Sequence, residues 1–132
     1  MIDYNARLIE TMLNDAADIA RSQEELVGNT RFGCIIAHRK KILATGTNHY
    51  KSHPVQARFS PRRHAIHMHS ETNAIVNYIR NGHSIDLLSK CTMYIARTTC
   101  DGNVALAKPC TGCQRAIVEY GIGDVYWTTN GE

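Results

Sequence analysis

Two short motifs stand at the beginnings of two expected helices, and both carry side chains of the kinds that bind metals. His69-Ser70-Glu71 opens a helix that runs to about Ile79, and Pro109-Cys110-Thr111-Gly112-Cys113 opens a helix that runs to Tyr120. Cysteines at positions i and i+3 of a helix point the same way, so Cys110 and Cys113 can share one ion, and the free N–H groups of the helix start favour their thiolate forms. A third ligand is then needed, and His69 at the other helix start would provide it. The chain must therefore fold so that the two helix starts meet.

The expected ligands, His69, Cys110 and Cys113, leave a fourth position for water. Three protein ligands with one open position are typical of a catalytic zinc ion rather than a structural one. Two thiolates and a neutral imidazole balance the charge of zinc, which makes the ion a weaker acid toward its water than an all-histidine site would be. Glu71 lies two residues after a ligand and can accept and return the proton. The sequence therefore predicts Zn²⁺ as cofactor and Glu71 as the catalytic residue.

Hydrophobic periodicity and turn residues predict the other elements. Apolar residues at helical spacing indicate an amphipathic helix, and short apolar runs bounded by Gly, Asn or basic residues indicate strands. The expected helix is 3–20, and the expected strands are 31–38, 42–44, 92–97 and 124–129. Residues 46–65 have no sustained period and are expected to form a long loop. Because helices separate the later strands, some strands should pair in parallel and helices should cover the sheet.

Composition narrows the class of protein. A chain of 132 residues, 43% of them hydrophobic, fits one domain over residues 1–132. The net charge of +3 suits an anionic small molecule and falls short of the basic excess typical of polynucleotide-binding proteins. The sequence shows no apolar stretch of membrane-spanning length and no leader, so a cytoplasmic protein without membrane contact is expected.

The five cysteines are an odd number, which argues against a disulfide framework. Cys34 and Cys91 fall in or beside apolar strands and are expected in the core. Cys100 has no assigned role.

The two motifs together resemble the cytidine and deoxycytidylate deaminase family, in which a histidine or cysteine precedes a non-ligating glutamate and Pro-Cys-x-x-Cys follows. The order of expected elements extends the resemblance over almost the whole chain. It implies a three-layer α/β/α fold with a mixed sheet of four to five strands flanked by helices, and an assembly of identical subunits. It also implies hydrolytic deamination of a cytosine nucleotide or nucleoside, with dCMP and (deoxy)cytidine favoured, in which Glu71 would move protons between the attacking water, ring nitrogen N3 and the leaving amine.

Three features depart from the family pattern. Ser70 stands where a small apolar residue is usual, and its expected contribution is a backbone N–H to the substrate base. The sequence ends after the fourth expected strand, whereas the family usually continues into a fifth. The additional cysteine and histidine pattern that holds a second zinc in some deoxycytidylate deaminases is not seen.

Further substrate contacts are expected from Asn48, Arg58, Arg63 and Tyr126. Asn48 ends a segment that resembles the family's substrate loop, where an asparagine binds a sugar hydroxyl; an ordinary turn residue is the alternative. Arg58 and Arg63 belong to a basic loop that could bind a phosphate, or that could simply be solvated. Tyr126, or its neighbour Trp127, is expected to face a base.

Other interpretations stay open at this point. A Cys-x-x-Cys pair also occurs in structural zinc half-sites and in redox pairs, and His64 or His67 could replace His69 as a ligand. The rival activities are deamination of a base in tRNA or single-stranded DNA, or of a purine. A non-catalytic zinc-binding module is the rival from another class of protein.

Overall fold

A computed structural model of the chain describes residues 4–23, 30–50, 53–59 and 68–130. In this part of the chain, one sheet of five strands runs in the order β2-β1-β3-β4, with β5 also paired to β3. The strands are β1 (Thr30–His38), β2 (Lys41–Thr47), β3 (Thr92–Thr99), β4 (Val104–Ala105) and β5 (Asp124–Trp127). The β3–β5 pair is parallel and the other pairs are antiparallel, so the sheet is mixed, as predicted.

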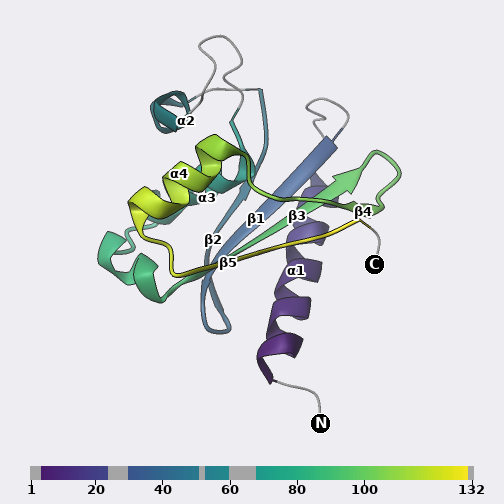
Figure 1. Cartoon of the computed structure of the whole chain (residues 1–132), viewed down its shortest axis with the longest axis horizontal. Helices are drawn as coiled ribbons and strands as arrows, with labels where there is room; N and C mark the ends of the chain where they lie inside the picture. Colours follow the sequence, from purple (N-terminus) through teal and green to yellow (C-terminus); the bar gives the residue numbers. More distant parts are fainter. Residues whose placement is uncertain (1–3, 24–29, 51–52, 60–67, 131–132) are drawn as a thin grey trace.

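One long helix covers one face of the sheet, and two shorter helices lie on the other (Figure 1). Helix α1 (Tyr4–Ser22) packs on β1 and β3 through a cluster that includes Met12, Ile35 and Tyr94. Helices α3 (Ser70–Arg80) and α4 (Thr111–Tyr120) contribute to a larger cluster on the opposite face. The predicted three-layer fold is therefore confirmed.

Two glycines allow helices to approach the sheet closely. A Cβ atom on Gly33 of β1 would lie 2.1 Å from the carbonyl oxygen of Ala16 in α1. A Cβ atom on Gly46 of β2 would lie 2.4 Å from the backbone of Ser70 and Ala74 in α3. Gly46 therefore sets how closely the first turn of α3, which carries the His69 motif, packs against the sheet.

The turns between elements follow the sequence signals. Arg39, in the basic turn between β1 and β2, has φ 56°. Helix α3 ends at Arg80, and its C-cap residue Asn81 is followed by Gly82 with φ 85°. Helix α4 ends at Tyr120, and its C-cap residue Gly121 has φ 74°, a left-handed conformation that suits glycine.

The prediction of one long loop over residues 46–65 is wrong, because Pro54–Phe59 forms the short helix α2. Proline suits the first helical position, since its missing N–H has no partner there in any case. The side chain of His53 accepts a hydrogen bond from the N–H of Val55 at 3.1 Å. Gln56 and Phe59, one turn apart, are both buried. Six residues are too few to show a hydrophobic period, so tertiary burial decided this helix.

Two further elements were not expected from the sequence. A 3₁₀ helix, η1 (Ile85–Lys90), precedes β3, and the two-residue strand β4 follows it. The last strand ends at Trp127 rather than at Thr129. Strand β4 lies beside the end of β3 and β5 beside its beginning, so both share one edge of that strand.

Candidate metal centre

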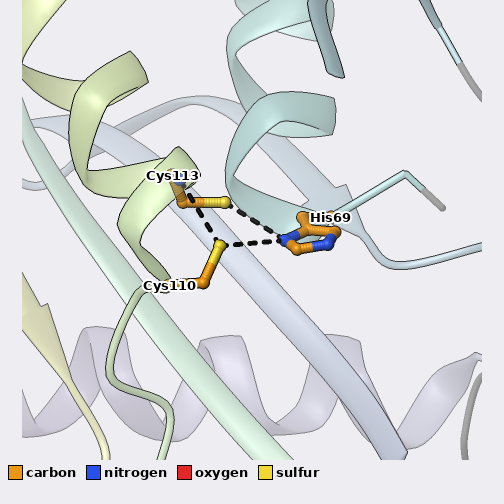
Figure 2. Close-up of side chains that lie close together, drawn as sticks. All are labelled: His69, Cys110 and Cys113. Carbon is orange, nitrogen blue, oxygen red and sulfur yellow. Dashed lines mark hydrogen bonds between the residues drawn. The ribbon is translucent and has the colours of Figure 1, made fainter. Parts of the chain in front are cut away.

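The starts of α3 and α4 meet, as the motifs require. His69 is the N-cap residue of α3, and Cys110 is the N-cap residue of α4, where its Sγ accepts a hydrogen bond from the N–H of Cys113 at 3.4 Å. Both cap residues have extended backbone geometry. Figure 2 shows the imidazole of His69 facing the two sulfur atoms.

The three side chains have the spacing of a zinc site. Nδ1 of His69 lies 3.3 Å from Sγ of Cys113 and 3.5 Å from Sγ of Cys110. Tetrahedral zinc, with Zn–S bonds of about 2.3 Å and Zn–N bonds of about 2.0 Å, separates nitrogen from sulfur by about 3.5 Å. All three candidate ligand atoms lie within 4.8 Å of one another. His69, Cys110 and Cys113 therefore form a potential zinc site, with Nδ1 as the ligand atom of the histidine.

No fourth histidine, cysteine or carboxylate joins this group among the described residues. Three protein ligands leave one tetrahedral position for water or substrate, which is the arrangement of a catalytic zinc site. His64 and His67, the alternative ligands considered from the sequence, lie outside the described residues.

The two cysteines of the cluster differ in the pKa of their thiols. The pKa of Cys110 is lowered to about 4, first by a hydrogen bond from the Cys113 thiol, with His69 adding to the effect. The pKa of Cys113 is raised, because its thiol donates to Cys110 and is buried. The pKa of His69 is raised mainly by its hydrogen bond to Cys110. Cys110 is thus a thiolate near neutral pH, which is the form that binds zinc.

Glu71 lies beside the ligand cluster in the first turn of α3. The residue is only 5% exposed, and its Oε1 accepts a hydrogen bond of 2.7 Å from the hydroxyl of Ser70, which is fully buried. Cys34 of β1 lies behind the carboxylate: burial, and secondarily the negative charge of Glu71, raises the pKa of this thiol. Ser70 therefore holds one oxygen of Glu71, and Glu71 also lines a pocket beside the ligand cluster.

A pocket of about 200 Å³ opens beside these residues. Its walls include His69, Cys110 and Glu71. The other lining residues come from four segments of the chain: Thr30, Phe32, Asn48, Met68, Ser70 and Lys108. Sites that enclose a drug-sized ligand are typically about 300–1,000 Å³. The enclosed part of the pocket therefore suits one small ring, and any groups attached to that ring would extend toward the opening of the pocket.

Gln56 supports the metal ligand from behind and was missed in the sequence. Helix α3 has no side-chain cap of its own at His69. The side-chain oxygen of Gln56, a residue 2% exposed in α2, accepts the N–H of His69 at 3.0 Å and also a hydrogen bond from the hydroxyl of Thr72. Gln56 lies in a segment that was expected to be a loop, and nothing in the sequence indicates that its side chain is buried or that it binds the start of another helix.

Only some of the residues that were expected to contact the substrate lie at the pocket. Asn48 and Ser70 line the pocket. The side-chain oxygen of Asn48 accepts the N–H of Phe32 at 2.9 Å, and its amide nitrogen donates to the carbonyl of Thr30 at 3.4 Å. Asn48 thus links the end of β2 to β1, and both its side-chain oxygen and its side-chain nitrogen already form a hydrogen bond with the backbone.

Arg58 and Tyr126 are not brought to the pocket. Arg58 forms an ion pair with Glu119 of α4 and lies over the ring of Phe59. Arg63 lies outside the described residues. Tyr126 stacks on Tyr94, with ring centroids 5.9 Å apart, and Tyr94 belongs to the cluster under α1, so Tyr126 is on the opposite face of the sheet.

The remaining cysteines follow the sequence expectation. Cys34 and Cys91 are buried in the core, and Cys100 is an exposed free thiol in the turn after β3. Within the described residues, no helix combines the length and the apolar character needed to cross a membrane.

Comparison with known proteins agrees with this site. Residues 7–129 match the family model described as the cytidine and deoxycytidylate deaminase zinc-binding region. No curated protein sequence matches the chain.

Several solved structures share the fold at low sequence identity. The dCMP deaminase from the cyanophage S-TIM5 is 20% identical, with a TM-score of 0.63 over 96% of this chain and 86% of that chain. The cytidine deaminase from Mycobacterium tuberculosis is 14% identical, with a TM-score of 0.56 over 97% of this chain and 85% of that chain. A diaminohydroxyphosphoribosylaminopyrimidine deaminase/reductase from Thermotoga maritima is 20% identical, with a TM-score of 0.63 over 96% of this chain but only 31% of that chain.

Proposed function

The chain belongs to the cytidine and deoxycytidylate deaminase family, whose zinc-binding region it matches over residues 7–129, and on that basis we propose that it deaminates a cytosine nucleotide or nucleoside. The favoured substrates are dCMP and (deoxy)cytidine, and the products are the uracil analogue and ammonia. The observation that carries the proposal is a buried carboxylate, Glu71, lining the same small pocket as two of the three potential zinc ligands.

The chain's own residues supply the proton chemistry in this proposal. A zinc ion held by His69, Cys110 and Cys113 would supply Lewis acidity, the chemistry that lets water act as a nucleophile near neutral pH. Glu71 takes one proton from the attacking water and delivers it to N3 of the ring. It then takes the second proton from the hydroxyl now bonded to C4 and delivers it to the amino group, which leaves as ammonia while C4 becomes a carbonyl. The Ser70 hydroxyl holds Oε1 of Glu71 and so orients the carboxylate that carries the protons.

The pocket also supports the choice of a small substrate. Phe32 offers an apolar wall to a ring, and Asn48 and Ser70 offer polar atoms beside it. The solved structure of the S-TIM5 dCMP deaminase in complex with dCMP and dUMP has a TM-score of 0.60 to this chain, so this fold accommodates such ligands.

The test is an ammonia-release screen of the zinc-loaded protein. The panel contains cytosine, cytidine, deoxycytidine and their mono- and triphosphates, the adenine and guanine counterparts, and a short single-stranded oligonucleotide. Release from the cytosine mononucleotides or nucleosides is expected. Turnover of only purines or only the oligonucleotide would refute the proposed substrate class.

The Glu71→Gln variant tests the role of the carboxylate. The change keeps the size of the side chain but removes the proton carrier, so turnover should be abolished while one zinc ion per chain remains bound. Glu10→Gln, an exposed carboxylate of α1, is the matched control and should keep wild-type activity. An active Glu71→Gln protein would contradict the assignment.

We also propose that the protein assembles from identical subunits, as the family resemblance implies. Val118 of α4 and Trp127 of β5 are 79% and 36% exposed and line one shallow hollow, which supports the proposal because a contiguous exposed apolar patch is typical of a protein interface. Light scattering at micromolar concentration should give a mass above that of one chain, and a monomer would refute this point.

A further inference from the structure

The end of β3 carries two polar side chains that face the pocket side of the sheet without satisfying their hydrogen bonds. Arg97 and Thr99 are two residues apart and therefore point to the same face. Nε of Arg97 and Oγ1 of Thr99 are both buried and have no hydrogen-bond partner in the described part of the chain. Leaving such donors without a partner costs free energy, so each unsatisfied group requires an explanation.

These two residues lie directly beside the pocket wall. In the β1–β3 ladder, Arg97 is opposite Phe32 and Thr99 is opposite Thr30, and both partners line the pocket. The guanidinium carbon of Arg97 lies 5.8 Å from the centroid of the Phe32 ring. The guanidinium group thus sits one side chain away from the enclosed space, on the face that carries Glu71 and the zinc ligands.

Lys108 adds a second positive charge on the wall of the same pocket. It is exposed, lines the pocket, and lies in the segment that leads from β4 to α4 (Figure 1). No ion pair joins Arg97 or Lys108 to a carboxylate of the described residues, in contrast to Arg58, which is paired with Glu119. Two cations that form no ion pair within the described residues, together with the Thr99 hydroxyl that lacks a hydrogen-bond partner there, have the chemistry of an anion site.

We propose that Arg97, Lys108 and Thr99 form a subsite for the phosphomonoester of the substrate, so that the chain prefers a cytosine nucleoside monophosphate to the nucleoside. This inference rests on the proposed function and specifies its substrate. The enclosed pocket holds about 200 Å³, so the ring occupies it and the phosphate lies toward the mouth, where Lys108 is exposed.

The test compares substrates that differ only in the phosphate. The ratio of the kcat/KM value for dCMP to that for deoxycytidine is measured for wild type, Arg97→Gln and Lys108→Gln. We expect the ratio to fall about tenfold or more in each variant, the scale of one lost charge-assisted hydrogen bond. Inhibition of the wild type by inorganic phosphate should weaken in both variants.

The matched control is Arg31→Gln. Arg31 lies next to Phe32 in β1, and its Nε is likewise buried without a partner, but it points to the opposite face, the one that Gly33 presents to α1. Its substitution should leave the substrate ratio unchanged. Equal loss for dCMP and deoxycytidine in Arg97→Gln, the same change of ratio in Arg31→Gln, or a wild-type preference for a phosphodiester in an oligonucleotide would each overturn the proposal.

A binding measurement separates this proposal from the proposed function. Calorimetric titration of the zinc-loaded protein with inorganic phosphate needs no turnover. If the protein releases ammonia from no cytosine compound but binds phosphate through Arg97 and Lys108, the proposed function fails and the anion subsite stands. If it deaminates deoxycytidine and dCMP equally well and does not bind phosphate, the subsite fails and the proposed function stands.

Discussion

At the scale of single residues, Ser70 and Glu71 show how one side chain can define the role of another. The buried hydroxyl of Ser70 donates to Oε1 of Glu71 at 2.7 Å, at a position where the family usually has a small apolar residue. A hydrogen bond to a charged group is stronger than one between neutral groups, so it holds the carboxylate in one orientation. Ser70 therefore contributes its side chain to the site, whereas only its backbone N–H was expected to act from the sequence.

Replacing Ser70 by Ala should lower kcat with little change in KM. Without the hydroxyl, Glu71 loses its fixed orientation, and a loss of about 1 kcal/mol corresponds to a roughly fivefold slower step. Steady-state kinetics check the rate, and metal analysis checks that zinc content is unchanged. A variant with wild-type kcat would show that the Ser70 hydroxyl does not orient the carboxylate.

Replacing Cys113 by Ala should abolish zinc binding, because only two of the three potential ligands would remain. The matched control is Cys100→Ala, which removes an exposed thiol outside this group and should bind zinc like the wild type. Metal analysis after gel filtration gives the zinc content of each protein. Full zinc occupancy in Cys113→Ala would exclude this ligand set.

At the scale of elements, the short helix α2 supports the start of α3. Gln56 accepts hydrogen bonds from the N–H of His69 and the hydroxyl of Thr72, and this replaces the side-chain cap that α3 lacks. Arg58 on the same helix pairs with Glu119 of α4. The helix that the sequence did not predict thus contacts both helices whose starts carry the metal ligands.

Replacing Gln56 by Met should weaken zinc binding by about 10- to 100-fold, the usual effect of losing a hydrogen bond that orients a metal ligand. Methionine keeps the volume of the side chain but accepts no strong hydrogen bond. Gln56→Glu keeps an acceptor at the same position and should remain closer to the wild type. Competition with a chromogenic chelator measures zinc affinity, and equal affinities for the Met and Glu variants would contradict this role.

At the scale of the whole molecule, the zinc site joins elements that come from distant parts of the chain. His69 belongs to α3 and the two cysteines to α4, and both helices pack on the same face of the sheet. A ligand that binds only the folded state stabilises it in proportion to the logarithm of its free concentration over its Kd.

Removal of the metal with a chelator should therefore lower the stability of the fold. At a free zinc concentration 1,000-fold above its Kd, the loss is about 4 kcal/mol. Scanning calorimetry with and without chelator should show a lower Tm for the treated wild type. Cys113→Ala should show no response to chelator, and an unchanged Tm in the wild type would mean that the ion does not link the two helices.

The fold class and the ligand set could be predicted from the sequence because their signals are local. His69, Glu71, Cys110 and Cys113 stand at fixed distances from helix starts, and helical geometry alone determines which way side chains at i and i+3 point. The order of the main strands and helices follows from hydrophobic periodicity, and the structure confirms it.

Tertiary structure alone decided which other residues reach the pocket. Arg58 was expected at the substrate because it is basic and close to His69 in sequence, yet it pairs with Glu119, and Tyr126 points to the other face of the sheet. Lys108 lines the pocket, and Arg97 is brought to its wall by the β1–β3 register. A sequence pattern specifies the face of an element on which a residue lies, whereas the packing of elements far apart in the chain specifies what that face meets.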